Sequence, residues 1–60
     1  MPTAERRAHY ANRAIELREM ADATRDPDIR TTLREMAGSY DKLVEEADRV
    51  IALRRGLPGA

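Results

Sequence analysis

The chain of 60 residues contains no cysteine, phenylalanine or tryptophan. Without cysteine, no disulfide can stabilise a small fold and no set of thiolates can hold a structural metal ion. The aromatic residues are limited to Tyr10 and Tyr40, which gives little material for an apolar ligand pocket or for a surface on which nucleic-acid bases stack. Stability and binding must therefore come from aliphatic residues, alanine and charge pairs.

The chain also lacks an excess of either charge, and it lacks any long apolar run. Eleven Lys and Arg residues balance eleven Asp and Glu residues, which argues against a general polyanion binder or a membrane-surface peptide. No apolar stretch approaches the roughly 18 residues of a membrane-spanning helix, and the first residues show no signal-peptide apolar core. We therefore expect a cytoplasmic protein with no membrane partner.

The chain does contain apolar residues that recur at alternating intervals of four and three residues. Such steps keep residues on one side of an α-helix, so each run predicts a stripe that packs on another helix. The stripe of the second half comprises Ile29, Leu33, Met36, Tyr40, Leu43, Ala47 and Val50, and that of the first half comprises Tyr10, Ala14, Leu17, Ala21 and Thr24. The pattern predicts an all-α fold, a single domain over residues 1–60 in which two helices pack as an antiparallel hairpin with coiled-coil spacing.

Capping signals set the expected ends of both helices. Thr3 is a suitable N-cap for the first helix. Asp26 followed by Pro27 starts the second helix, because aspartate caps free N–H groups and proline fits the first helical position. We expect the second helix to end at the segment Gly56-Leu57-Pro58, with Gly56 in a left-handed turn. The helices are thus expected over residues 4–23 and 27–55.

Further apolar residues lie beside the two facing stripes. Ala37, Val44 and Ile51 widen the stripe of the second helix, whereas Ala4, Ala8, Ala11 and Ile15 form a second strip on the first helix. A single hairpin would leave both of these strips exposed, and one alanine-rich seam buries little surface for a chain of this length. We therefore predict a homodimer that forms a four-helix bundle. The predicted packing and interface residues are Ala8, Tyr10, Ala11, Ala14, Ile15, Leu17, Leu33, Met36, Tyr40, Leu43, Val44 and Ala47.

No set of residues in the sequence points to a catalytic, cofactor or metal site. His9 is the sole histidine and follows Glu5 by one helical turn, as in ordinary surface pairs. The Glu-x-x-His step of di-metal helical bundles is absent, as are a nucleophile–base set and a glycine-rich phosphate loop. We predict no enzyme activity, no cofactor and no metal. The expected function is a protein–protein interaction or structural module, such as a small accessory subunit or adaptor, that binds itself or a helical surface of a larger protein.

An alternative function rests on arginines at the open end of the hairpin. Folding would bring together Arg6, Arg7, Arg49, Arg54 and Arg55. Clustered arginines contact nucleic-acid phosphates in many regulators. Acidic residues at the same end nearly neutralise this cluster, so nucleic-acid binding is the weaker of the two hypotheses.

Gly38 interrupts the second helix at a position away from the predicted stripe. A glycine there costs about 1 kcal/mol relative to alanine. It is either a tolerated surface residue or a point where the backbone of a partner approaches closely. The first interpretation is favoured, because single glycines in helices usually have no special role.

Three segments, residues 14–21, 26–30 and 33–43, carry packing and capping patterns. They read A-x-E-L-R-x-(L/M)-A, D-P-x-x-R and L-x-x-(L/M)-A-x-x-Y-x-x-L. In these patterns the chain resembles a group of short uncharacterised bacterial helical-hairpin proteins over most of its length. The resemblance implies the hairpin fold and brings no activity with it.

Overall fold

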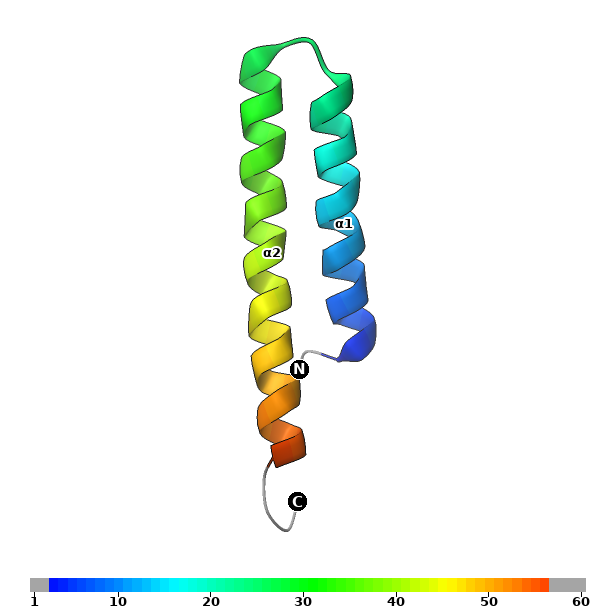
Figure 1. Cartoon of the computed structure of the whole chain (residues 1–60), viewed down its shortest axis with the longest axis vertical. Coiled ribbons are helices and arrows are strands. Elements are labelled where there is room, and N and C mark those ends of the chain that lie inside the picture. Colours follow the sequence, from blue (N-terminus) through cyan, green and yellow to red (C-terminus); the bar gives the residue numbers. More distant parts are fainter. Residues whose placement is uncertain (1–2, 57–60) are drawn as a thin grey trace.

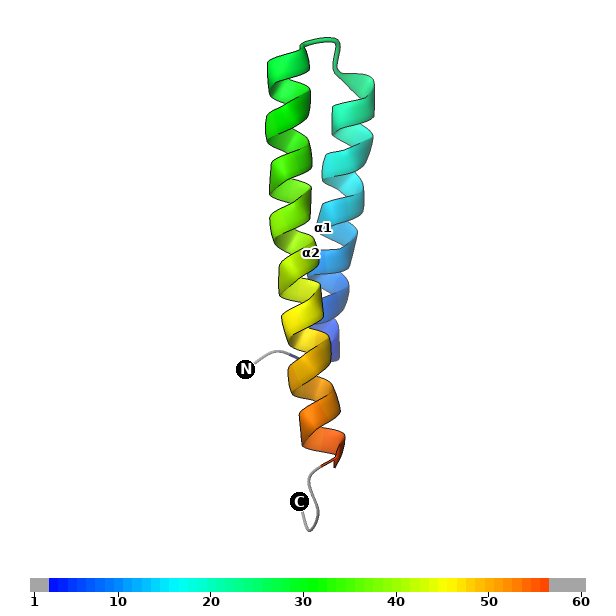
Figure 2. The same cartoon turned by 60° about the vertical axis from the view of Figure 1, so that its left-hand side comes forward.

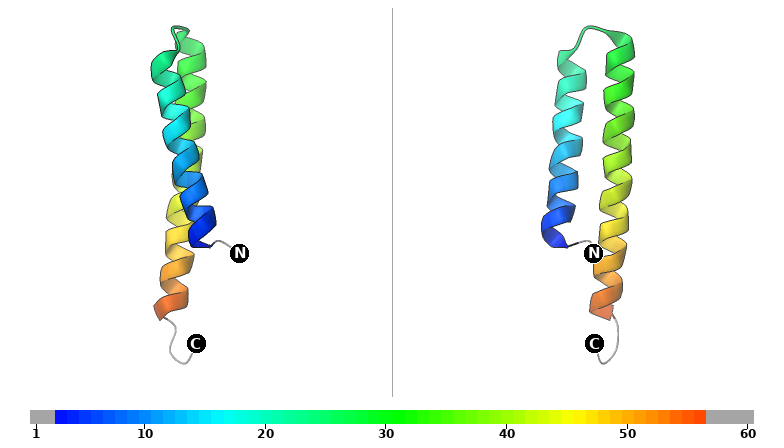
Figure 3. Two further views of the ribbon diagram at one scale, coloured as in Figure 1. Left: turned by 90° about the vertical axis from the view of Figure 1, so that its right-hand side faces the viewer. Right: turned by 180° about the vertical axis from the view of Figure 1, so that it is seen from behind.

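The computed structural model of the chain describes residues 3–56 and consists of two α-helices joined by a short loop (Figure 1). Helix α1 spans Ala4–Ala23 and helix α2 spans Pro27–Gly56. The helices run antiparallel, and α1 crosses α2 at a shallow angle when viewed edge-on (Figure 3). The principal-axis extents of the Cα atoms are 53 × 15 × 14 Å, so the molecule is elongated. The predicted all-α antiparallel hairpin is confirmed.

Side-chain caps fix the start of each helix. The Thr3 hydroxyl accepts a hydrogen bond from the backbone N–H of Arg6 at 3.2 Å. Before α2, the Asp26 carboxylate accepts hydrogen bonds from the N–H groups of Asp28 at 2.9 Å and Ile29 at 3.3 Å. These bonds satisfy donors that have no partner within the first turn of a helix. Both predicted caps and both predicted helix starts are confirmed.

The end of α2 differs from the prediction. Gly56 is the last residue of the helix, and its φ does not lie in the left-handed region. Glycine can continue a helix, although it loses more backbone entropy than other residues. Leu57 and Pro58, which were expected to complete the turn, lie outside the described residues. With 30 residues against 20 in α1, α2 extends past the start of α1 at the end opposite the loop (Figure 2).

The seam between the helices consists mainly of alanine. Its buried residues are Ala14, Leu17, Ala21, Ala37 and Ala47. Leu33 and Tyr40 are partly buried and pack against the cluster formed by Ala14, Leu17 and Ala37. Small side chains at these positions let the two backbones approach closely along the seam. The stripe predicted on α1 faces α2, as expected.

The stripe on α2 is rotated from the predicted one. Ile29, Met36 and Leu43 were expected to face α1, but they are 52%, 43% and 38% exposed. The positions one residue later face α1 instead, with Ala37 buried and Val44 half-buried.

Two features of α1 account for this rotation. Its seam offers Ala14 and Ala21, and the rotation places Ala37 and Val44 of α2 against α1 in place of the larger Met36 and Leu43, which allows closer packing. The same rotation brings Asp41 and Asp48 of α2 within reach of arginines on α1.

Candidate interaction faces

Ion pairs connect the helices on one side of the seam, which we call the ionic face. The pairs are Arg7 with Asp48, Arg18 with Asp41, and Arg34 with Asp22, the last at 3.6 Å between Nη2 and Oδ1. Arg7 and Arg18 each donate from two guanidinium nitrogens to both oxygens of the carboxylate. The hydrogen bond with Arg18 lowers the pKa of Asp41, and the same bond raises the pKa of Arg18. Because these side chains are largely exposed, the pairs favour one rotation of the helices more than they add stability.

The position of each residue relative to the seam shows which face it occupies. Each step along an α-helix turns the side chain by about 100°. On the ionic face, Asp41 and Asp48 each follow a seam residue, Tyr40 or Ala47, by one position. Residues that precede a seam residue by one position therefore lie on the opposite side of the hairpin.

That opposite side carries a strip of large apolar side chains, which we call the apolar face. Along α2 it consists of Ile29, Met36, Leu43 and Val50, spaced seven residues apart, and seven residues are nearly two helical turns. Met20 joins the strip from α1, where it precedes the buried Ala21 and is 50% exposed. Within residues 3–56, four of the six exposed large hydrophobic side chains belong to this face. Concentrated exposed apolar side chains of this kind mark interaction surfaces.

A small polar cluster lies at the middle of the apolar face. Arg13 donates a hydrogen bond to Oε2 of Glu16 at 3.0 Å. This bond, and after it an interaction with the Tyr40 hydroxyl, raises the pKa of Arg13. The ring centroids of Tyr40 and Tyr10 are 6.2 Å apart. The ring centroids of Tyr10 and His9 are 6.1 Å apart, and these two rings meet edge to face. His9 is thus an exposed residue beside a tyrosine.

The second strip predicted on α1 lies on the ionic side of the seam. Ala8 and Ile15 are exposed, Ile15 by 54%, and Ala11 is half-buried. Each follows a seam position by one residue, and the same line continues into Arg18 and Asp22. The strip therefore runs directly into the ion pairs.

The arginines expected at the open end occupy different levels of the hairpin. Arg6 and Arg7 lie in the first turn of α1, and Arg7 is paired with Asp48. Arg54 and Arg55 lie in the last turn of α2, beyond the first turn of α1 (Figure 1). The overhang of α2 thus spreads these arginines along the helix axis.

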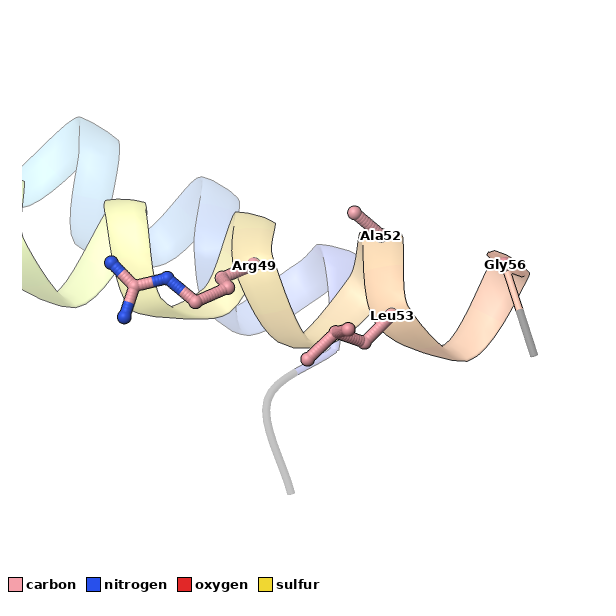
Figure 4. Close-up of a pocket in the computed structure, with 4 residues that line it drawn as sticks. All are labelled: Arg49, Ala52, Leu53 and Gly56. Atoms are coloured by element: carbon pink, nitrogen blue, oxygen red, sulfur yellow. The ribbon is translucent and has the colours of Figure 1, made fainter.

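A shallow depression of about 320 Å³ lies on the last turns of α2, lined by Arg49, Ala52, Leu53 and Gly56 (Figure 4). All four lining residues come from one helix, and they include no nucleophile or general base. Over residues 3–56, no three or more His, Cys, Asp and Glu side chains are grouped so that they could hold a metal ion. Neither described helix is long and apolar enough to cross a membrane.

Sequence reasoning missed the two-sided character of the hairpin. The seven-residue spacing of Ile29, Met36, Leu43 and Val50 was visible but was assigned to the seam. The positions of the charged residues could have revealed it. Asp41 and Asp48 each follow a seam residue by one position, and each pairs with an arginine of α1, Arg18 or Arg7.

Comparisons with protein-family models, with curated proteins and with solved structures found no match for this chain. The resemblance to bacterial helical-hairpin proteins stays a prediction.

Proposed function

We propose that this chain is a non-enzymatic protein–protein interaction module that associates with itself into a four-helix bundle. The observation that carries the proposal is the amount of surface that the hairpin leaves exposed. The accessible surface is 4789 Å², whereas a compact monomer of 6.8 kDa is expected to expose about 3,950 Å². The excess of roughly 800 Å² equals what one partner contributes to a protein–protein interface of standard size.

The composition of the core supports the same proposal. Leu17 is the sole large side chain of residues 3–56 that is fully buried, and the other buried residues are alanines. Burial of apolar area is the main favourable contribution to folding. A seam of alanines contributes little of it, so a second layer of helices would supply what the single hairpin lacks.

Sedimentation equilibrium at micromolar concentration tests the proposal. We expect a species of twice the 6.8 kDa chain mass, and a thermal midpoint that rises with protein concentration because association stabilises the folded state. A fully folded monomer whose thermal midpoint is independent of concentration would contradict self-association.

If the chain also serves as an accessory subunit or adaptor, the bundle is the form that binds its partner. Purification of the tagged chain from its host, followed by identification of bound proteins, addresses that role. The cytoplasmic location remains a prediction that fractionation of the same cells would test.

Nucleic-acid binding remains the alternative, supported by the exposed Arg6, Arg49 and Arg55 near the open end. The pairing of Arg7 with Asp48 and the zero net charge weigh against it, because little counterion release would accompany binding. A gel-shift titration with structured RNA and duplex DNA at low salt distinguishes the two functions. Affinity that falls with added salt would favour the alternative.

A further inference from the structure

We infer that the apolar face of the hairpin is covered by the apolar face of a second copy of this chain, with the two loops at opposite ends of the bundle. This inference rests on the proposed self-association and adds which face is buried and in which orientation. It replaces the α1 strip around Ile15, the interface expected from the sequence.

The two apolar strips cannot share one interface. Face-to-face packing of two hairpins related by a two-fold axis buries the same side of each copy. Met20, Met36 and Leu43 lie on one side of the seam, and Ile15 lies on the other. A four-helix bundle made of two copies can therefore bury either the apolar face or the ionic face of each hairpin, but not both.

Burial of the ionic face would be unfavourable. A second copy placed there would remove the ion pairs Arg7–Asp48 and Arg18–Asp41 from water, and desolvation of charges costs more than their attraction returns unless every lone pair is satisfied. The α1 strip around Ile15 also has no apolar counterpart on α2, since Arg34 and the two aspartates occupy that side of α2. The apolar face carries no ion pair between the helices among the described residues.

The orientation follows from the residues that each helix brings to the apolar face. With the loops at opposite ends, α2 packs antiparallel on α2 of the other copy, so that Met36 lies beside the second Leu43 and Ile29 beside the second Val50. With the loops together, α2 would instead pack on α1 of the other copy. The corresponding line on α1 is Arg6, Arg13 and Met20, in which a single residue is apolar. The antiparallel α2 pairing therefore buries the most apolar surface.

The same orientation satisfies the polar cluster at the middle of the face. The strip on α2 is centred near Tyr40, which packs against the buried cluster that includes Ala14 of α1. The two α1 helices would then cross near Ala14, and Arg13 of one copy would approach Glu16 of the other. The existing Arg13–Glu16 pair becomes a self-complementary group of two cations and two carboxylates.

Paired cysteines test the face and the orientation together, and the chain has no cysteine of its own to interfere. The test variant is Met36→Cys with Leu43→Cys, and the matched control is Ala8→Cys with Ile15→Cys, which has the same seven-residue spacing on the other face. Under mild oxidation at micromolar concentration, we expect the test variant to become a covalent dimer and the control to stay monomeric on a non-reducing gel. Cross-linked Cα atoms must come within about 7 Å, which loops-together packing does not allow for these two positions.

Charge substitutions provide a second, independent readout. Met36 and Ile15 are both exposed in the single hairpin, so either can be replaced without loss of its internal packing. We expect Met36→Glu to raise the dimer dissociation constant at least about 100-fold, because the charge would be buried without a partner, and Ile15→Glu to change it less than about 3-fold. Circular dichroism at high protein concentration checks that both variants keep their helices.

The outcomes separate this inference from the proposed function. If the unmodified chain sediments as a monomer, self-association is wrong and so is this interface. If the chain is a dimer but the control cysteines cross-link, or the Met36/Leu43 cysteines do not, the interface assigned here is wrong while the interaction module stands. If Ile15→Glu raises the dimer dissociation constant more than Met36→Glu does, the assignment of the interface to the apolar face is likewise wrong.

Discussion

The guanidinium of Arg30 donates a hydrogen bond to the carbonyl oxygen of Thr24, 2.8 Å away, and so joins the start of α2 to the end of α1. The Thr24 carbonyl lies where helix α1 ends and intrahelical donors run out. Nε of the same arginine is buried and has no hydrogen-bond partner within the described part of the chain. Arg30 thus connects the two helices across the loop through this hydrogen bond. It is also the arginine of the D-P-x-x-R pattern.

Replacement of Arg30 by methionine should loosen this turn. The Arg30→Met change keeps the apolar length of the side chain but removes the hydrogen bond to Thr24, and we expect the free energy of unfolding to fall by about 1–2 kcal/mol. Arg34→Met is the matched control, because its 3.6 Å pair with Asp22 is exposed and should contribute less than about 0.5 kcal/mol. Urea unfolding at a fixed protein concentration measures both. Equal losses would show that the bond to Thr24 does not hold the turn.

The stability of the hairpin should depend on pH through Asp41. The hydrogen bond from Arg18 holds the pKa of Asp41 below its ordinary value of 3.8. Because the folded pKa is the lower one, the charged carboxylate stabilises the fold above pH 3.8, and this contribution disappears as the pH falls through the folded pKa. Asp41→Asn should therefore lower the thermal midpoint at neutral pH and have no effect at strongly acid pH.

Arg18→Gln is the companion variant for this prediction, since it removes the other half of the same pair. Between neutral pH and pH values below 3.8, the thermal midpoint of the unmodified chain should fall more than that of either variant. The two variants should differ from the unmodified chain by the same amount. A difference from the unmodified chain that persists unchanged into acid would contradict an electrostatic role for the pair.

Gly38 should be replaceable by alanine with a gain in stability. A Cβ added at Gly38 meets nothing within 4 Å in the hairpin, and the residue lies away from the apolar face. We expect Gly38→Ala to raise the free energy of unfolding by about 0.5–1 kcal/mol, the usual cost of glycine inside a helix. Thermal unfolding combined with sedimentation checks this. A weakened dimer would instead favour close approach of a partner backbone at this position.

The ends of the helices could be predicted from the sequence because capping is local. Thr3 and Asp26 accept hydrogen bonds from N–H groups two or three residues away, so neighbouring residues suffice to identify them. The antiparallel arrangement also followed from local signals, since Asp26 and Pro27 end one helix and start another. The left-handed turn expected at Gly56 failed because glycine permits that conformation without requiring it.

The rotation of α2 could not be predicted because it depends on the facing helix. Two overlapping stripes share Leu33, Tyr40 and Ala47, and hydrophobicity alone favours the one with Met36 and Leu43. The small residues of α1 and the ion pairs across the seam select the other stripe. This choice decides which residues form the candidate interaction face, so the face required the structure.

The contrast between Leu17 and Leu53 tests how much of the fold depends on its thin core. Leu17 is 1% exposed at the centre of the seam, whereas Leu53 is 61% exposed on the overhang of α2. Leu17→Ala should cost about 2–5 kcal/mol through lost burial and a residual cavity. A domain of this length has a total stability of only about 3–9 kcal/mol, so this variant should lose most of its helical circular dichroism at temperatures well below the thermal midpoint of the unmodified chain.

Leu53→Ala is the control and should change the free energy of unfolding by less than about 0.5 kcal/mol, as other exposed substitutions do. If both variants unfold alike at the same concentration, the Leu17 seam is not what holds the two helices together.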